Sequence, residues 1–416
     1  MNIKLSTTNQ HIQNSIQITG SKSESNRLLL LQALYPNISI ENLSNSDDSR
    51  VMQQALKVFE EPSSTLGVGL ADIHHAGTAM RFLTAYFSIQ KEREVVLTGS
   101  KRMKERPIKI LVEALRQLGA DISYELNEGF PPLRIRGKQL TASRVSLSAD
   151  VSSQYISALL LIAPKLQNGL KLELEGKITS VPYIKMTLAL LSTLEIETSF
   201  DGNIIKVLPK ETVADTQLVV ESDWSSASYF YSIAALSELG SEITLSSYKQ
   251  DSLQGDSVLA EIYTQFGVVT TYEGTSIVLK KVKDHEDTTI NCELANAPDI
   301  AQTIAVTCLG LGMGCDLYGL HTLPIKETDR LAALQTELQK LGAEVEITDK
   351  SLHLKPCETI IEHIAIDTYQ DHRMAMAFAP LALRVTIAIN EAEVVSKSYP
   401  DYWKDLERLG VRIVEI

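Results

Sequence analysis

Hydrophobic and polar positions follow one recurring order along the chain. An amphipathic, helix-like segment ends in Leu-Gly or Phe-Gly, and a strand-like alternation of apolar and polar residues follows at once. Four stretches show this order: ALRQLGADISY (within 110–124), IYTQFGVVTTY (within 258–272), ELQKLGAEVEI (within 331–347) and DLERLGVRIVEI (within 404–416). Glycine directly after the last helical residue suits a left-handed helix cap. The pattern therefore predicts repeated helix–strand units.

The spacing of the caps predicts how many units the chain holds. The capping glycines are Gly119, Gly267, Gly342 and Gly410. Successive intervals are about 70 residues, except the first, which is about twice as long. A missing copy is therefore expected near residue 193, where residues 185–200 show the pattern with Glu195 in place of glycine. A weaker sixth copy at 50–60 supplies only a helix.

Six such units divide most naturally into two α/β domains of three units each. The second domain is expected to begin near residue 223, after the polar stretch Glu221–Asp223. Two strand-like segments, Ile3–Leu5 and Ile16–Ile18, precede Gly20 and fit either domain. The alternative is that ordinary helix–strand units resemble one another by coincidence, because Leu-Gly caps are common.

Composition narrows the class of protein. A chain of 416 residues that is 44% hydrophobic and 22% charged can bury two sizeable cores. Its net charge of −13 argues against a nucleic-acid or anionic-membrane partner, so any anion must bind at a local cluster of cations. The N-terminus lacks a signal-peptide core, and the longest apolar runs are too short to span a bilayer. We expect a cytoplasmic protein.

The cysteines predict free thiols. They are four in number and lie in the C-terminal part of the chain: Cys292, Cys308, Cys315 and Cys357. The chain has no Cys-x-x-Cys pair and no zinc-like spacing of cysteine with histidine. His74 and His75 are adjacent, so their side chains diverge and do not suggest a metal site.

A candidate anion site is the stretch Gly20–Arg27, which runs directly into the apolar block Leu28–Leu31. Serines and an asparagine at a helix start can cap backbone N–H groups, and this end of a helix attracts anions. Lys22 and Arg27 add two full charges. Taken alone, the stretch also fits a capped surface helix with incidental basic residues.

Similar helix starts recur along the chain. Val151–Tyr155, Ser180–Tyr183 and Asp223–Tyr229 each place hydroxyl groups before an apolar helix-like run. Small residues in Ala76–Ala79 would let backbone amides approach a ligand, although a plain helix start explains them too. For any single stretch capping is the simpler interpretation. Together they favour several helix N-termini that bind one anionic ligand.

The C-terminal half contains acids, bases and fixed cations. Asp299 stands at a helix start, and Lys326–Arg330 holds two cations and two acids in five residues. If Lys326 and Arg330 are both helical, their spacing of four places them on one face. Asp371–Arg373 and Ser396–Asp401 add further cations. Neighbouring opposite charges shift pKa values toward the working pH of general acid–base chemistry, and the alternative is a surface ion-pair network.

These motifs, taken in order, resemble one known family. They are Gly20–Arg27, Ala76–Arg81, Arg106–Ile108, Ser152–Gln154, Lys326–Arg330, Asp371–Arg373 and Lys397–Pro400. The series is similar to that of the 5-enolpyruvylshikimate-3-phosphate synthases, across essentially the whole chain. The resemblance implies the enolpyruvyl transferase fold, an inside-out α/β barrel type with two domains of three units. It also implies that the chain crosses between domains twice, with residues 1–20 and 223–416 in one domain and 21–222 in the other.

The implied reaction transfers the enolpyruvyl group of phosphoenolpyruvate to the 5-hydroxyl of shikimate 3-phosphate and releases phosphate, in aromatic amino acid (chorismate) biosynthesis. The residues implied to bind shikimate 3-phosphate are Lys22, Ser23, Arg27, Ser152, Ser153, Gln154, Ser180, Tyr183, Asp299, Thr322 and Lys326. Those implied to bind phosphoenolpyruvate are Lys22, Gly77, Arg106, Gln154, Arg330, Arg373 and Lys397. Asp299, helped by Lys326, would accept the hydroxyl proton, and Glu327 would protonate the methylene carbon, with Lys22 sharing the proton traffic.

The resemblance implies neither metal nor organic cofactor, and we expect a monomer that binds only its small-molecule substrates. It also implies a glyphosate target, with an alanine at Gly77 causing resistance. Two positions depart from the usual motif: His75 and Thr322 each stand where the family often has asparagine. One alternative is the sister transferase that acts on UDP-N-acetylglucosamine, which has a cysteine in the loop that here spans Thr98–Arg106 without one. A non-catalytic anion-binding relative is the other.

Overall fold

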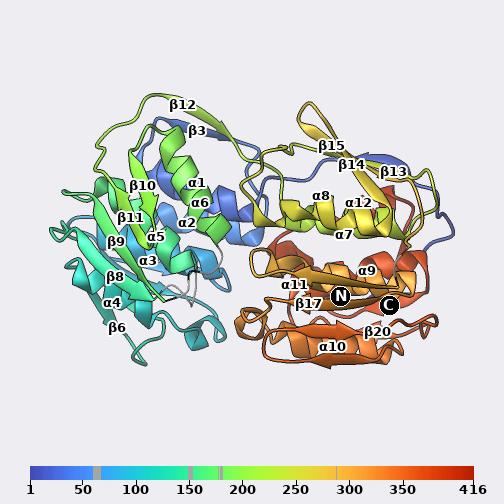
Figure 1. Cartoon of the computed structure of the whole chain (residues 1–416). Coiled ribbons are helices and arrows are strands. Elements are labelled where there is room, and N and C mark those ends of the chain that lie inside the picture. Colours follow the sequence, from blue (N-terminus) through green and yellow to red (C-terminus); the bar gives the residue numbers. More distant parts are fainter. Residues whose placement is uncertain (60–66, 149–152, 177, 179–180, 287) are drawn as a thin grey trace. The chain divides into compact units, whose positions relative to one another are not determined.

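The computed structural model describes residues 1–59, 67–148, 153–176, 178, 181–286 and 288–416 (Figure 1). Its backbone contacts divide the chain into two units. The N-terminal unit is Ser21–Val220, and the C-terminal unit combines Met1–Gly20 with Glu221–Ile416. The sequence-based boundaries were residues 20 and 222.

The sheets show the repetition most directly. Among the described residues, five four-stranded sheets share one strand pattern, in which two parallel strands continue into two antiparallel ones. In the N-terminal unit, the first of these sheets has the strand order β4 (Val68–Asp72), β5 (Glu94–Thr98), β7 (Leu133–Arg136), β6 (Asp121–Tyr124). The second has the order β8 (Arg144–Ser148), β9 (Leu170–Glu175), β11 (Ile204–Val207), β10 (Thr198–Asp201). The third sheet of this unit is reduced to the parallel pair β3 (Ile38–Glu41) and β12 (Thr216–Val219).

The C-terminal unit has three complete sheets. The first has the strand order β2 (Gln13–Ile16), β13 (Glu242–Ser246), β15 (Ser276–Lys281), β14 (Val268–Glu273). The second has the order β16 (Thr289–Glu293), β17 (Gly314–Tyr318), β19 (Leu352–Leu354), β18 (Val345–Ile347). The third has the order β20 (Ala365–Ile366), β21 (Ile387–Ile389), β1 (Ile3–Ser6), β22 (Arg412–Glu415). The first two strands of the chain thus pair within this unit, β1 with β21 and β22, and β2 with β13.

The most buried helices, such as α3 (Gly77–Ser88) and α9 (Ala301–Leu311), form the interior of each unit, and the sheets lie outside them. In the N-terminal unit they are α1 (Lys22–Leu34), α2 (Asp47–Leu56), α3 (Gly77–Ser88), α4 (Lys109–Gln117), α5 (Ser153–Ile162) and α6 (Val181–Thr193). Those of the C-terminal unit are α7 (Trp224–Leu236), α8 (Leu259–Ile262), α9 (Ala301–Leu311), α10 (Arg330–Lys340), α11 (His372–Phe378) and α12 (Tyr402–Arg408). Short 3₁₀ helices are η2 (Met103–Glu105), η3 (Ala163–Lys165), η4 (Gly255–Val258), η5 (Tyr263–Phe266), η6 (Pro298–Ile300), η7 (Leu323–Ile325), η8 (Ala379–Leu383) and η9 (Ala392–Lys397).

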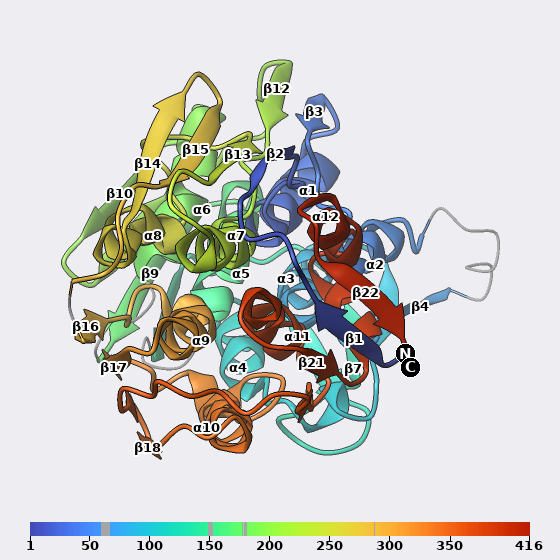
Figure 2. The ribbon, with the colours of Figure 1, turned by 90° about the vertical axis from the view of Figure 1, so that its right-hand side faces the viewer.

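Side-chain polarity explains this arrangement. Every residue of α3 and of α11 is buried, so both helices lie inside a core. The strands instead alternate buried and exposed positions, as in β9, so each sheet turns one face to the core and one to water. Figure 2 shows α7, α9 and α11 side by side within the C-terminal unit, with the sheets around them. The predicted α/β class with an inside-out arrangement is confirmed.

The helix caps confirm the predicted repeat, including its exception. Gly119, Gly267, Gly342 and Gly410 all have positive φ angles, between 76° and 104°. Glu195, the expected substitute, also lies in the left-handed region, with φ 56°. Residues with a Cβ adopt this conformation at a cost, so the fifth cap keeps the geometry at the expense of local strain. The helix expected at 50–60 corresponds to α2, which begins earlier, at Asp47, and ends at Leu56, while residue 60 lies outside the described residues.

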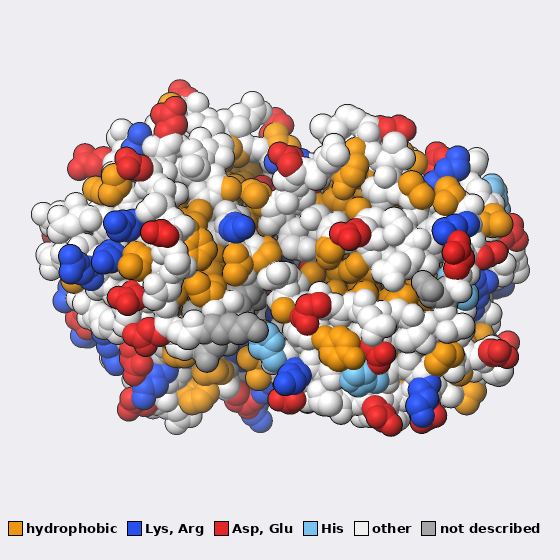
Figure 3. Space-filling model, in the orientation of Figure 1, with side chains coloured by type: hydrophobic (Ala, Val, Ile, Leu, Met, Phe, Trp, Pro, Cys, Tyr) orange, Lys and Arg blue, Asp and Glu red, His pale blue; other side chains and the backbone are white. Residues whose placement is uncertain are grey.

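Two further expectations concern the chemistry of the chain. Cys292, Cys308 and Cys315 are buried free thiols, and Cys357 is a half-buried one. Within the described ranges, no helix combines the length and apolarity that a membrane crossing requires. On the face drawn in Figure 3, acidic and basic side chains are interspersed over both units.

Candidate functional site

The densest charge cluster of the C-terminal unit is centred on Arg330, the first residue of α10. Its side chain is 2% exposed and contacts three carboxylates. Nε lies 2.6 Å from Asp371 Oδ2, Nη1 lies 2.9 Å from Asp299 Oδ1, and Nη2 lies 2.8 Å from Glu327 Oε2. Burial opposes the charge of Arg330, but these carboxylates together raise its pKa above the usual value. The guanidinium is therefore a fixed cation.

Asp299 is the complementary centre of the same cluster. Besides Arg330, it contacts Arg373, whose Nη2 is 3.0 Å from Oδ2, and Lys326, whose Nζ is 3.4 Å from Oδ1. Burial alone would raise the pKa of Asp299, yet the three cations hold it well below its usual range. Asp299 is therefore ionised and, while all three cations surround it, a weak base.

Local structure explains how these residues reach one another. Pro298 begins η6 and places Asp299 just before the buried helix α9. Asp371 is the N-cap of α11, where its carboxylate accepts a hydrogen bond from the backbone N–H of Arg373 at 2.9 Å. One loop thus supplies both an anion for Arg330 and a cation for Asp299.

The helical spacing expected for Lys326 and Arg330 is wrong. Lys326 follows η7 with φ −80° and ψ −151°, which is extended backbone, and α10 begins only at Arg330. The residues Glu327–Asp329 between them belong to neither helix, and Asp329 caps α10. Both cations nevertheless reach the same oxygen of Asp299, because the loop folds back on η6.

Two predicted residues of this unit lie outside the direct contacts of the cluster. Lys397 donates to the carbonyl oxygen of Gln370 at 2.6 Å, next to Asp371 in the chain. Tyr369 and Gln370 both have positive φ angles, 53° and 55°, so this turn is strained. Thr322 has a buried hydroxyl for which the described residues offer no hydrogen-bond partner. A buried hydroxyl of this kind is suited to a ligand's hydroxyl group.

In the N-terminal unit the corresponding residue is Arg27, on α1. It is 2% exposed, and its hydrogen bonds in the described part of the chain go to neutral oxygens: Thr187 Oγ1 at 2.8 Å, Ser23 O at 2.7 Å, Ser157 Oγ at 2.9 Å and Tyr183 O at 3.5 Å. Its guanidinium carbon lies 5.4 Å from the ring centre of Phe82 and 5.8 Å from that of Tyr183. Burial lowers the pKa of Arg27 to about 10, although Tyr183 and Glu24 oppose this effect.

Lys22 begins the same helix and approaches an acid. Its Nζ is 3.8 Å from Asp48 Oδ2, and His75 Nε2 is 3.9 Å from Asp48 Oδ1. Asp48 therefore joins the first predicted anion-binding stretch to the Ala-Gly-Thr segment. His75, one of the two departures from the family motif, makes this contact.

Gly77 and Arg106 lie against each other. A Cβ atom built on Gly77 would stand 2.6 Å from Nη1 of Arg106 and 3.1 Å from its Cζ. A larger residue here would push the guanidinium away, while the backbone of Gly77 has ordinary helical geometry at the start of α3. Gln154 donates to Thr78 Oγ1 at 3.3 Å, so it lies beside the same segment.

The serines expected to hold a phosphate are only partly described. Ser152 and Ser180 lie outside the described residues. Ser153 is the first residue of α5 and half-buried, and Tyr183 lies in the first turn of α6. These positions at helix starts agree with the predicted pattern.

Several site residues were not identified from the sequence. Thr187 and Ser157 hold Arg27. Asp256 contacts the cluster of the C-terminal unit through Ser225. The Ser-rich start at Asp223–Tyr229 was a signal for Ser225, but the lone Asp256 had none.

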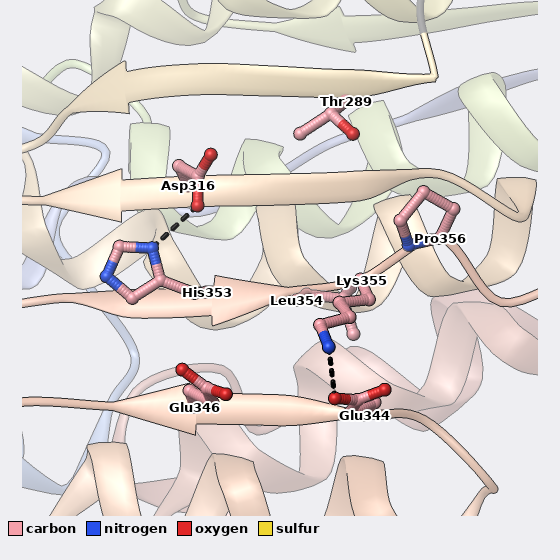
Figure 4. A pocket seen from close by; sticks show the side chains of 8 residues that line it. All are labelled: Thr289, Asp316, Glu344, Glu346, His353, Leu354, Lys355 and Pro356. Carbon is pink, nitrogen blue, oxygen red and sulfur yellow. Dashed lines mark hydrogen bonds and ion pairs between the residues drawn. The ribbon is translucent and has the colours of Figure 1, made fainter.

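A cavity of about 260 Å³ lies elsewhere, on the sheet of β16, β17, β19 and β18 (Figure 4). Its lining includes Asp316, Glu344, Glu346, His353 and Lys355. Here His353 Nδ1 is 2.6 Å from Asp316 Oδ1, and Lys355 pairs with Glu344. Three acids make this cavity a poor site for an anion, and none of the predicted site residues lines it. Within the described residues, no group of His, Cys, Asp and Glu side chains could hold a metal ion.

Comparisons with known proteins assign the family. Residues 6–406 match the family model described as EPSP synthase (3-phosphoshikimate 1-carboxyvinyltransferase). A 3-phosphoshikimate 1-carboxyvinyltransferase of Bacteroides fragilis (strain YCH46) is 46% identical over 406 residues, which cover 97% of this chain and 96% of that protein. One of Vibrio campbellii is 37% identical over 421 residues, covering 96% of this chain and 97% of its own.

Solved structures support the same fold. An EPSP synthase from Acinetobacter baumannii superposes with a TM-score of 0.81 at 21% identity, over 100% of both chains. The enolpyruvyl transferase NikO from Streptomyces tendae superposes with a TM-score of 0.74 at 14% identity, over 99% of this chain and 98% of that one. At such low identity these likenesses establish the architecture alone.

Proposed function

We propose which charged residues act in each step of the family's reaction in this chain, which belongs to the EPSP synthase (3-phosphoshikimate 1-carboxyvinyltransferase) family. The enzyme transfers the enolpyruvyl group of phosphoenolpyruvate to the 5-hydroxyl of shikimate 3-phosphate and releases phosphate, a step in aromatic amino acid biosynthesis. The observation that carries the division is the contact of Asp299 with three cations in one buried cluster.

The first half of the reaction is an addition to the double bond of phosphoenolpyruvate. A proton joins the methylene carbon, the 5-hydroxyl oxygen bonds to the carbon that bears the phosphate, and the hydroxyl proton leaves to a base. We assign the base to Asp299, with Lys326 beside it, and the proton donor to Glu327, with Lys22 sharing the proton transfer. In the second half phosphate leaves, and the methyl carbon returns one proton, so atoms and charge balance.

The substrate itself activates the base in this scheme. Arg330 and Arg373 bind the carboxylate of phosphoenolpyruvate, and both now contact Asp299. A second carboxylate at these guanidinium groups competes with Asp299 for their hydrogen bonds. The pKa of Asp299 then rises toward its usual range, because the cations that lower it are shared. Asp299 thus becomes a usable base only when phosphoenolpyruvate is bound.

The N-terminal unit supplies most of the groups for shikimate 3-phosphate and for the phosphate of phosphoenolpyruvate, and Thr322, Lys326 and Lys397 are added from the C-terminal unit. Arg27 and Ser23 bind the shikimate carboxylate, and Ser152, Ser153 and Ser180, with Tyr183, bind the 3-phosphate. Lys22, Gly77, Arg106, Gln154 and Lys397 surround the phosphate of phosphoenolpyruvate. Support comes from Arg27, whose charge is buried among neutral oxygens, and from Arg106, which lies against the backbone of Gly77. Thr322 and Lys326 complete the contacts of shikimate 3-phosphate.

The test is turnover with defined acceptors. Phosphate release from phosphoenolpyruvate is measured with shikimate 3-phosphate, with UDP-N-acetylglucosamine and with no acceptor. We expect release with shikimate 3-phosphate alone, and stoichiometric formation of the enolpyruvyl product. Release with the UDP-sugar would favour the sister transferase, and no release with either acceptor would favour a non-catalytic relative.

Its oligomeric state and location are also proposals. We propose a monomer in the cytoplasm, because each unit has its own buried core and both substrates are small metabolites. Light scattering coupled to size exclusion should give a mass close to 45.9 kDa. A mass of twice that value would contradict the monomer.

A further inference from the structure

Arg373 needs an anchor that does not change during the reaction. It lies in the first turn of α11, and its guanidinium donates to Asp299 Oδ2 at 3.0 Å and to the backbone carbonyl of Asp299 at 3.3 Å. The carboxylate of Asp299 gains and loses a proton in the proposed reaction. A hydrogen bond to that group therefore changes in strength at each step, and it cannot by itself fix the position of Arg373.

Ser225 provides a second contact that stays neutral. It lies in the first turn of α7, and its Oγ accepts from Arg373 Nη2 at 3.3 Å. The same Oγ donates its proton to Asp256 Oδ2. A hydroxyl has one proton, so donation to Asp256 turns a lone pair of Ser225 toward the arginine. The orientation of Ser225 is thus set by Asp256.

The carboxylate of Asp256 lies in an unusual environment. It belongs to η4 and is 4% exposed, and within the described residues its Oδ1 has no hydrogen-bond partner. Burial, with repulsion from Asp299 and Asp223, raises the pKa of Asp256 to about 7, while Arg373 and the Ser225 hydroxyl oppose the rise. A carboxylate held so unfavourably is typical of a functional site, because structure alone would be served by a neutral side chain.

We propose that Asp256 is a positioning residue for phosphoenolpyruvate, which orients Ser225 so that Arg373 stays in place when Asp299 changes its protonation state. The proposal rests on the proposed function, in which Arg373 binds the carboxylate of phosphoenolpyruvate. It also gives a role to the Ser-rich start of α7. This helix start, which the sequence suggested for anion binding, holds the arginine that binds the anion.

The proposal predicts different effects on the KM values of the two substrates. Loss of the anchor affects the site of phosphoenolpyruvate, whereas Arg27 and its partners lie in the N-terminal unit and are untouched. Asp256→Ala should therefore raise the KM for phosphoenolpyruvate about tenfold and leave the KM for shikimate 3-phosphate within about twofold. Asp256→Asn keeps an oxygen that can accept from Ser225, so it should restore most of the lost affinity.

The experiment measures both KM values and kcat at pH 8, above the raised pKa of Asp256, for the wild type and five variants. These are Asp256→Ala, Asp256→Asn, Ser225→Ala, the double variant Asp256→Ala/Ser225→Ala, and Glu221→Gln. Glu221 is the matched control: it is a buried carboxylate beside the start of α7, and it accepts from Trp224 Nε1 at 2.8 Å and Ser252 Oγ at 2.7 Å. Its substitution should lower the melting temperature without a selective change in either KM.

Because Asp256 acts through Ser225, the double variant should be no worse than the poorer single variant. The inference is overturned if Asp256→Ala leaves the KM for phosphoenolpyruvate unchanged, raises both KM values equally, or adds fully to Ser225→Ala. It is also overturned if Asp256→Asn is as impaired as Asp256→Ala. Failure of the proposed function would look different, because the wild type itself would then show no turnover with shikimate 3-phosphate.

Discussion

Arg27 and Arg330 are both 2% exposed, yet their surroundings are opposite. Arg330 contacts three carboxylates, which raise its pKa, whereas Arg27 donates to hydroxyl and carbonyl oxygens and has its pKa lowered to about 10 by burial. In the C-terminal cluster Arg330, Arg373 and Lys326 therefore each contact an acid before any substrate arrives. In the N-terminal unit Glu24 opposes the lowering of the pKa of Arg27, but the hydrogen bonds of its guanidinium go to neutral oxygens, so an anion can add to the compensation of this charge.

The difference suggests that the two regions have different functions. Charges that are balanced within the protein can exchange partners and protons with a small change in total electrostatic energy, which suits chemistry. A buried cation among neutral dipoles suits binding, because an anion gains the whole interaction. We interpret the C-terminal cluster as the catalytic one and the surroundings of Arg27 as a binding site.

The largest effect should come from the base. Asp299→Asn removes the proton acceptor and keeps the side-chain shape, so kcat should fall about a thousandfold. Phosphate release at saturating concentrations of both substrates measures the change. A loss of less than tenfold would show that Asp299 is one of several charges rather than the base.

The same substitution should change acid stability in a defined direction. Asp299 has a lowered pKa in the folded protein, so the unfolded chain binds the proton more tightly and stability falls as the pH drops. At pH 7 the free energy of unfolding of Asp299→Asn should be lower than that of the wild type by about 3 kcal/mol, since the buried Arg330 and Arg373 and the half-buried Lys326 lose a partner. Below about pH 4 this difference should shrink.

Urea unfolding followed by tryptophan fluorescence at pH 7 and at pH 3.5 measures both differences. A difference that is constant between the two pH values would mean that Asp299 is not stabilised as a carboxylate. The comparison between the units would then lose its electrostatic basis.

Gly77→Ala tests how the N-terminal unit presents its cations. The new Cβ would stand 2.6 Å from Arg106 Nη1, so the guanidinium must shift away. Glyphosate is longer than phosphoenolpyruvate, and we expect its inhibition constant to rise more than about tenfold while the KM for phosphoenolpyruvate rises less. Equal changes in both constants, or a wild type that glyphosate does not inhibit, would contradict this geometry.

The smallest effect concerns a position outside both clusters. Glu195 is exposed and has φ 56°, where glycine is favoured. Glu195→Gly should raise the free energy of unfolding by about 1 kcal/mol and leave kcat and both KM values unchanged. A thermal melt and one activity assay suffice, and a lower melting temperature would show that Glu195 makes contacts that offset its strain.

The repeat was predictable because it depends on local sequence. Five units end a helix at a left-handed residue, and the interval between caps located Glu195 although the glycine itself is missing. The reduced unit of β3 and β12 was harder to predict from the sequence, since its two strands are about 180 residues apart in the chain.

The candidate site was predictable where charges cluster in sequence, as in Lys326–Arg330. The contacts between these charged residues and the rest of the site were not predictable, because they depend on how the loops fold. Lys326 reaches Asp299 from extended backbone rather than from a helix. Asp256 contacts Ser225 across 31 positions of the chain, and nothing near Asp256 in the sequence distinguishes it from a surface acid.

The division between binding and chemistry can be tested by calorimetric titration of shikimate 3-phosphate into two variants, Arg27→Gln and Asp299→Asn. The control is Arg116→Gln, because Arg116 also lies in the N-terminal unit, donates to the carbonyl of Ile122 at 2.6 Å and lies 5.2 Å from the ring centre of Tyr124. We predict that Arg27→Gln weakens binding about a hundredfold, and that Asp299→Asn and the control stay within about threefold of the wild type. Equal losses in Arg27→Gln and Asp299→Asn, or a larger loss in Asp299→Asn, would contradict the account.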